Sequence, residues 1–220
     1  MKVAAPRTGL AQRAWRIAAV LSLTLAWGCA ALQPAVAPHP TFYSLDGATT
    51  PARSEPRAAA TAPTLIVSPT HAAGGFDSRR IMYVRQAGQL EYFAHNEWID
   101  TPARMLGPLI VAAIESGGAF RAVVQTPSPA SGEMRLDTEI LRLQHEFLHA
   151  PSRVRFTLRA YLVESATRRV IATREFDAVV PAASENPGGG VIAANRAVQA
   201  VLDELSAFCA EAARSARTGQ

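Results

Sequence analysis

The segment 134–180 most constrains the fold, because it contains three long extended stretches joined by connections of hairpin length. Within Val154–Val163 apolar side chains alternate with polar ones. An alternation with a period of two buries one face of a strand and leaves the other face in water. The three stretches, Met134–Phe147, Val154–Val163 and Arg169–Val180, therefore predict neighbouring antiparallel strands with one wet face.

Two further segments carry the periodicity of helices. An apolar stripe follows Pro102, which suits the first helical position because an N–H is not needed there, and Pro108 inside the stripe predicts a kink. In Val191–Ala213 apolar residues recur every three or four positions. The sequence therefore predicts one α+β domain, a mostly antiparallel sheet with two helices packed on one of its faces.

The N-terminus has the organisation of an export signal. A basic stretch precedes the apolar run Ile17–Trp27, which is too short to cross a bilayer, and Gly28 and Cys29 follow it. This order resembles a bacterial lipobox, in which the cysteine thiol receives a diacylglycerol. We therefore expect a lipoprotein signal peptide over residues 1–28 and lipid attachment at Cys29. The alternative is an ordinary signal peptide followed by an incidental cysteine.

The bulk charge depends on that signal. The whole chain has a formal charge of +4, but residues 1–28 hold one Lys and three Arg and no acid, which leaves 18 basic and 18 acidic residues. We therefore expect no nucleic-acid partner. Acylation of Cys29 would leave Cys209 without a disulfide partner, and its place in a helical apolar stripe predicts a small buried hydrophobe. Because Ala30 follows Cys29, the lipobox resemblance implies sorting to the periplasmic face of the outer membrane.

The remaining chain divides by composition. Residues 29–63 are rich in Ala and Pro and predict a tether, interrupted by a short strand near 42–45. Residues 64–213 contain the apolar periodicities and predict the periplasmic α+β domain, and residues 214–220 predict a frayed tail. Inside the domain, Ala87-Gly88 predicts a hairpin between Ile81–Arg85 and Gln89–Phe93.

An ordered set of short motifs runs from the N-terminus into the first helix. It consists of Cys29, Tyr43-Ser44-Leu45, the string FDSRRI at 76–81, Tyr92 to Trp98, and the apolar helix 101–114. The set resembles the ABC-type transport auxiliary lipoprotein family, the PqiC-like auxiliary components of MCE-type lipid transport systems, over roughly residues 40–212. The resemblance implies a non-catalytic protein without a cofactor.

The same resemblance implies partners. These are an MCE-domain subunit, the permease and ATPase of the same transporter, the outer membrane and further copies of the chain. Docking of that kind draws on aromatic and arginine anchors, and the candidates here are Tyr83, Arg85, Tyr92, Asn96 and Trp98. The alternative is that these aromatic side chains fill the core between sheet and helices. A free-standing lipid-binding lipoprotein is a further interpretation.

One string suggests a different chemistry. His145, Glu146 and His149 spell H-E-x-x-H, which on a helix binds Zn²⁺ through the two histidines and uses the glutamate as a base. A periplasmic zinc hydrolase is therefore the rival hypothesis. Pro151 and the strand pattern that follows favour a hairpin instead, and we expect no bound metal.

Overall fold

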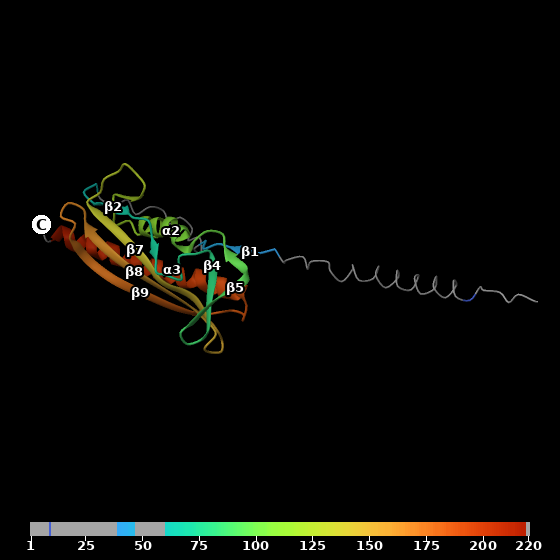
Figure 1. Cartoon of the computed structure of the whole chain (residues 1–220). Helices are drawn as coiled ribbons and strands as arrows, with labels where there is room; N and C mark the ends of the chain where they lie inside the picture. The colour runs from blue at the N-terminus through green and yellow to red at the C-terminus, as the bar shows by residue number, and fades with distance from the viewer. Residues whose placement is uncertain (1–8, 10–38, 47–59, 219–220) are drawn as a thin grey trace, which may run out of the picture. The chain divides into compact units, whose positions relative to one another are not determined.

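The computed structural model describes residues 9, 39–46 and 60–218, so the expected lipid-attachment residue Cys29 and all of the expected signal peptide except Gly9 lie outside the described residues. Residues 40–220 form a compact unit (Figure 1). Its elements follow the chain in the order β1 (Thr41–Tyr43), β2 (Thr64–Val67), β3 (His71–Ala72), β4 (Arg80–Gln86), β5 (Gln89–Trp98), α2 (Pro102–Ser116), β6 (Ala122–Gln125), β7 (Met134–Glu146), β8 (Arg153–Glu164), β9 (Val170–Pro181) and α3 (Pro187–Thr218).

The sheet is built around β7, a strand of 13 residues. Along one edge β7 pairs antiparallel with β8, which in turn pairs antiparallel with β9. Along its other edge β7 pairs in succession with three strands, β2 at Met134–Leu136, β3 at Glu139–Ile140 and β4 at His145–Glu146. The sheet then continues from β4 to β5 and β1, and from β2 to β6.

The expectation of a mostly antiparallel sheet is wrong, because the sheet is mixed. The pairs β1–β5, β2–β6, β2–β7, β3–β7 and β4–β7 are all parallel, and the antiparallel pairs are β4–β5, β7–β8 and β8–β9. The antiparallel pairs join strands that are neighbours in sequence through short turns, which is the arrangement that hairpin signals reveal. The parallel pairs join segments far apart in the chain, which no local pattern specifies.

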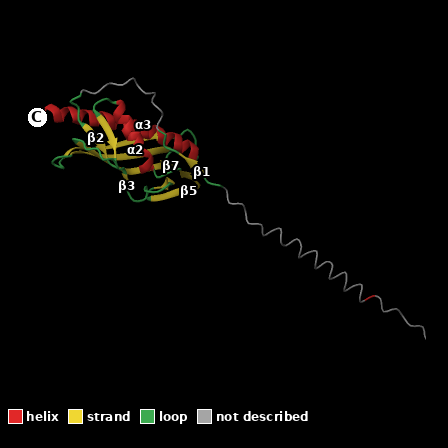
Figure 2. Ribbon diagram, turned by 90° about the horizontal axis from the view of Figure 1, so that it is seen from above, coloured by secondary structure: helices red, strands yellow, loops and turns green. Residues whose placement is uncertain are grey.

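Both expected helices are present and pack together over the sheet (Figure 2). Helix α3 packs on β8 and β9, and α2 packs on α3 and β6. Pro108 lies inside α2. The apolar side of this helix is buried at Leu106, Ile110 and Ile114. Helix α3 begins at Pro187, where the Oδ1 of Asn186 accepts the N–H of Gly189, and it continues to Thr218. No helix in the described part of the chain has the length and apolarity that a bilayer crossing requires.

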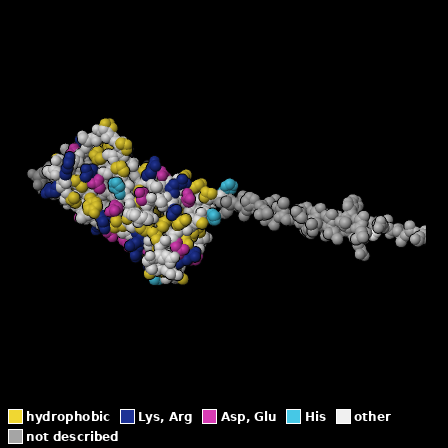
Figure 3. All heavy atoms as spheres, viewed as in Figure 1, with side chains coloured by type: hydrophobic (Ala, Val, Ile, Leu, Met, Phe, Trp, Pro, Cys, Tyr) yellow, Lys and Arg dark blue, Asp and Glu magenta, His cyan; other side chains and the backbone are white. Residues whose placement is uncertain are grey.

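The alternation in β8 is confirmed and explains the position of the core. Every second residue is fully or almost fully buried beneath α3, from 2% exposed at Val154 to 0% at Phe156, Leu158, Ala160 and Leu162. The opposite face carries charges that pair across strands, such as Arg159 with Glu139 and Glu175. Figure 3 shows acidic and basic side chains interspersed over the visible face of the domain, as such pairing requires. The helices therefore cover one side of the sheet, and the other side is solvated.

Candidate docking surface

The five candidate interface residues all lie on one hairpin, formed by β4 and β5 and turned at Gly88, whose φ of +80° suits glycine. The predicted hairpin is thus confirmed. Tyr83 and Arg85 lie on β4, and Tyr92, Asn96 and Trp98 lie on β5. The β4–β7 pairing places the hairpin beside the end of β7, where the N–H of Phe147 donates to the carbonyl of Val84.

Tyr83 belongs to a cluster of rings at this junction. Its ring centroid lies 4.5 Å from that of Phe93 and 6.0 Å from that of Phe147, and the guanidinium of Arg85 lies over it at 4.9 Å. The Tyr83 hydroxyl donates to Glu91, and that hydrogen bond, with burial and the charge of Glu91, raises the pKa of Tyr83. Tyr83 is 8% exposed, whereas Arg85 is exposed, so only the arginine of this pair is accessible.

Tyr92 presents an accessible ring on the same hairpin. It is 47% exposed, and the guanidinium of Arg80 lies 4.1 Å from its centroid. An arginine stacked on an exposed tyrosine is a preordered pair of the two side-chain types that dominate interface energies. Arg80 and Tyr92 therefore form an accessible anchor on the hairpin, and we call them the Arg80–Tyr92 pair.

Asn96 and Trp98 hold the hairpin to its surroundings. The Tyr43 hydroxyl donates to Oδ1 of Asn96 at 3.3 Å, which links β1 to β5. Trp98 is 3% exposed, and it lines a small cavity of about 10 Å³ together with His145 and Gly190. Trp98 therefore packs in the core of this chain, as the alternative interpretation of the aromatic residues expects.

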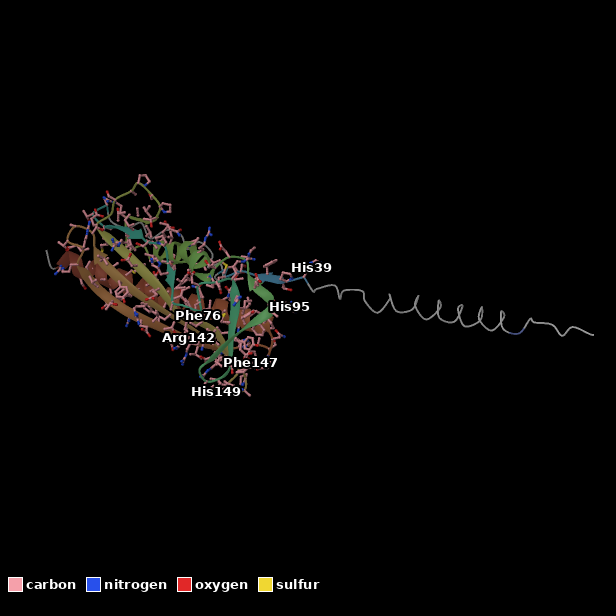
Figure 4. All side chains as sticks on the ribbon, in the orientation of Figure 1. His39, Phe76, His95, Arg142, Phe147 and His149 are labelled. Carbon is pink, nitrogen blue, oxygen red and sulfur yellow. The ribbon has the colours of Figure 1, made fainter. Side chains whose placement is uncertain are left out.

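Sequence reasoning missed three residues of this region. Arg80, Phe93 and Phe147 complete the ring cluster and the cation–π pair, yet Phe147 lies more than fifty positions beyond Phe93 in the chain. Figure 4 shows Phe147 and His149 together near the end of the hairpin. The alternation of β4 and β5 could have placed Arg80 and Phe93 on their faces, but nothing local indicates that the end of β7 lies beside them.

His145 is a core residue. It is 2% exposed, its ring stacks on Phe147 at 4.1 Å, and its Nε2 lies 2.8 Å from the hydroxyl of Ser152. Burial lowers the pKa of His145, against the opposing charge of Glu185. Nδ1 has no hydrogen-bond partner among the described residues. Instead, the backbone of Gly190 approaches it so closely that a Cβ there would lie 2.5 Å from Nδ1.

His145, Ser152 and Glu185 do not form a hydrolytic triad. Ser152 is 0% exposed, and Glu185 accepts the backbone N–H of Ser152 rather than contacting Nδ1 of His145. That hydrogen bond lowers the pKa of Glu185. A triad requires an accessible nucleophile and an acid that orients the base, and this arrangement supplies neither.

The structure does not support the zinc-hydrolase hypothesis for the H-E-x-x-H string. His145 and Glu146 end the strand β7, and His149 lies exposed in the connection to β8, so the two histidines do not share a helical face. Glu146 is 4% exposed and accepts Nε of Arg153 at 3.0 Å, with Nε of Arg155 at 3.9 Å. Within the described residues, no three His, Cys, Asp or Glu side chains gather to hold a metal ion.

An open groove of about 510 Å³ lies between β1 and the start of α3. One wall is the segment Phe42–Asp46, and the other carries Val191, Ile192, Asn195 and Arg196. The side chain of Asn195 joins the walls, because its Oδ1 accepts the N–H of Asp46 and its amide donates to the carbonyl of Ser44. In the described part of the sheet β1 pairs only with β5, so its other edge faces this groove.

Solved structures share this fold. Protein XCC0632 from Xanthomonas campestris is 22% identical, with a TM-score of 0.67 over 81% of this chain and 99% of that chain. A second crystal structure, of an uncharacterized protein, is 14% identical with a TM-score of 0.58, over 79% and 98% of the two chains. Lipoprotein GNA1162 from Neisseria meningitidis is 12% identical with a TM-score of 0.37, over 65% and 97%. The first two establish the mixed-sheet α+β fold as a known one.

The family follows from the sequence match itself. The model of the family described as ABC-type transport auxiliary lipoprotein component matches residues 43–206, most of the chain and nearly all of the folded domain. The chain belongs to this family, which confirms the resemblance drawn from its motifs. No match was found among curated proteins.

Proposed function

We propose that this protein is a non-catalytic, lipid-anchored subunit of an ABC-type, MCE-associated lipid transport system. The observation that carries the proposal is the family match over residues 43–206. The lipobox-like order that ends at Cys29 supports an acyl anchor, and two or more acyl chains are enough for durable attachment. In this role the chain docks the transporter to the periplasmic face of the outer membrane.

The partners in this proposal are the MCE-domain subunit, the permease and the ATPase of the same system, together with further copies of the chain. The Arg80–Tyr92 pair and Arg85 are the accessible anchors that support such contacts, because they are exposed and preordered. Tyr83 and Asn96 support the hairpin that presents them. Trp98 contributes by fixing the hairpin to the core.

The anchor is tested by intact-protein mass spectrometry of the membrane fraction from expressing cells. We expect a mature chain that begins at Cys29 and carries diacylglycerol with a further acyl chain such as palmitate. Cys29→Ser is expected to abolish the modification and release the chain from membranes. Cys209→Ser is the matched control, because the described structure buries that thiol completely. An unmodified Cys29 in the processed wild-type chain would refute the anchor.

Docking is tested by affinity purification with the MCE-domain subunit co-expressed. Tyr92→Ala removes an exposed ring, and we expect it to weaken recovery of the partner by about tenfold or more, as loss of a hot spot does. Val170→Ala is the matched control, because Val170 is 51% exposed and lies on β9, outside the hairpin. Equal recovery with both variants would refute the hairpin as the contact. Failure of the wild type to recover any subunit of the transporter would refute the partnership.

A further inference from the structure

Exposed apolar side chains gather around β1. Phe42 is 49% exposed, Ile99 is 60% exposed and Ile192 is 50% exposed. Phe42 and Ile192 line the groove between β1 and α3, and the N–H of Ile99 donates to the carbonyl of Tyr43 at 2.7 Å. Phe42 is paired with Glu97, and Ile99 directly follows the last residue of β5. We call Phe42, Ile99 and Ile192 the β1 surface.

Two guanidinium groups border the β1 surface. That of Arg79 lies 5.2 Å from the centroid of the Phe42 ring and 3.6 Å from the carboxylate of Glu97, and its side chain is 46% exposed. Arg196 and Asp46 both line the groove, and none of the ion pairs in the described part of the chain includes Arg196. Large apolar side chains flanked by arginine match a phospholipid surface, where the apolar groups enter the acyl boundary and the cations meet phosphate.

The covalent chain brings this surface near the proposed anchor. Phe42 follows Cys29 by thirteen positions, and an extended chain of that length spans at most about 45 Å. Figure 1 shows β1 at one end of the domain and the C-terminus at the other. An acyl anchor at Cys29 therefore keeps the β1 end within reach of the bilayer and raises the effective concentration of lipid there.

We propose that the β1 surface rests on the phospholipid head groups of the membrane that holds the anchor. This inference rests on the proposed lipidation of Cys29 and adds an orientation to it. The free backbone edge of β1 limits how deeply the β1 surface enters the bilayer, because unpaired N–H and C=O groups are unfavourable in hydrocarbon but can form hydrogen bonds with water and head groups. With β1 against the membrane, the opposite end of the domain points into the periplasm.

The test uses the full lipoprotein in vesicles of phosphatidylethanolamine and phosphatidylglycerol. Ile192→Cys and Val170→Cys are labelled with an environment-sensitive nitrobenzoxadiazole dye, and brominated phospholipids serve as quenchers. The two positions are matched in exposure, at 50% and 51%. The native thiols do not compete, since Cys29 is acylated in this proposal and burial raises the pKa of the Cys209 thiol to about 12.

We expect blue-shifted emission and quenching of the label at position 192, at least about twofold stronger than at position 170. A second variant carries the label at Ile99→Cys together with Ile192→Glu, and the added charge is expected to reduce quenching of the label at position 99. A water-like label at position 192 in a lipidated, vesicle-bound chain overturns this inference alone. A chain without an acyl group at Cys29 overturns the anchor as well. If the transporter subunits in detergent shift the emission of the label at position 192 to the blue and vesicles do not, the surface contacts a protein, and the membrane contact is overturned.

Discussion

The close approach of helix α3 to His145 gives a prediction with a definite sign. A Cβ added at Gly190 would lie 2.5 Å from Nδ1 of His145 and 3.1 Å from its Cε1, well inside normal contact distances. The ring has little freedom to retreat, because Nε2 is bonded to Ser152 at 2.8 Å and the ring stacks on Phe147. Gly190→Ala therefore forces a shift of either the ring or the helix.

The change in the free energy of unfolding follows from three contributions, one stabilising and two destabilising. Alanine is favoured over glycine inside a helix by about 0.5–1 kcal/mol. Overpacking a filled core costs about 1–3 kcal/mol, and disturbing the buried hydrogen bond to Ser152 costs about 1 kcal/mol. We therefore expect Gly190→Ala to reduce the free energy of unfolding by about 1–3 kcal/mol.

Gly188 offers a matched control two residues earlier in the same helix. A Cβ there would meet Oδ1 of Asn186 at 3.5 Å and the hydroxyl of Tyr43 at 3.9 Å, both ordinary contacts. Gly188→Ala is therefore expected to be neutral or to stabilise by up to about 1 kcal/mol. The two variants make the same chemical change, so the comparison isolates the contact with His145.

The assay is urea unfolding followed by tryptophan fluorescence. Trp98 is buried, and it is the only tryptophan after residue 28, so it reports on this region in the processed chain. We expect the Gly190→Ala midpoint to fall by about 1 M urea with an unchanged slope. Combining it with His145→Ala should cost less than the sum of the single changes, by about 0.5–3 kcal/mol. A Gly190→Ala midpoint equal to or above that of Gly188→Ala would refute the reasoning.

Three further predictions concern buried groups. Burial lowers the pKa of His145 below the ordinary 6.5, so the folded chain has its full stability above pH 6.5 and loses stability as the pH falls from 6.5 toward the folded-state pKa. The unfolding midpoint of His145→Gln should vary less over this pH window. An equal dependence of the midpoint on pH in the variant and the wild type would contradict the assignment. The buried Cys209 thiol should resist Ellman's reagent in the folded chain and react once the chain is unfolded in urea, and rapid reaction without urea would contradict its burial. Glu146→Gln should destabilise by about 1–3 kcal/mol in thermal unfolding, because it removes the buried charge that pairs with Arg153 at 3.0 Å, and chelators should leave the wild-type melting temperature unchanged.

The features that follow from local pattern could be predicted from the sequence. The β8 alternation, the hairpin turned at Gly88 and the apolar stripe of α3 each depend on residues a few positions apart. The partners of the short strands could not be predicted this way. β2 and β3 contribute four and two residues, and both pair in parallel with β7, more than sixty positions away in the chain. Short strands carry too few side chains to specify a register by themselves.

The candidate docking residues show the same division. The predicted hairpin contained Tyr83, Arg85 and Tyr92, and the structure extends its second strand to include Asn96 and Trp98. Which of these residues remain accessible depends on segments from elsewhere in the chain. Tyr83 is covered by Phe93 and Phe147, whereas Tyr92 projects into solvent with Arg80 beside it. Composition alone treats these two tyrosines as equivalent. The structure separates a ring that stabilises the hairpin from a ring that can contact a partner.

A β-bulge in β7 explains why the H-E-x-x-H string was ambiguous. Up to Ile140, which faces Leu158, the buried positions are even-numbered; the register then shifts, and the odd-numbered Leu143 and His145 are buried instead. The large apolar residues Leu136, Ile140 and Leu143 are therefore spaced by four and then three, which is also the spacing of a helix. The same shift turns His145 into the core beneath α3 and directs Glu146 to the opposite face, where it pairs with Arg153. Because His145 and Glu146 are consecutive in a strand, they face opposite sides of the sheet, and the inserted residue determines that His145 rather than Glu146 enters the core. Each of the two side chains is therefore a structural group.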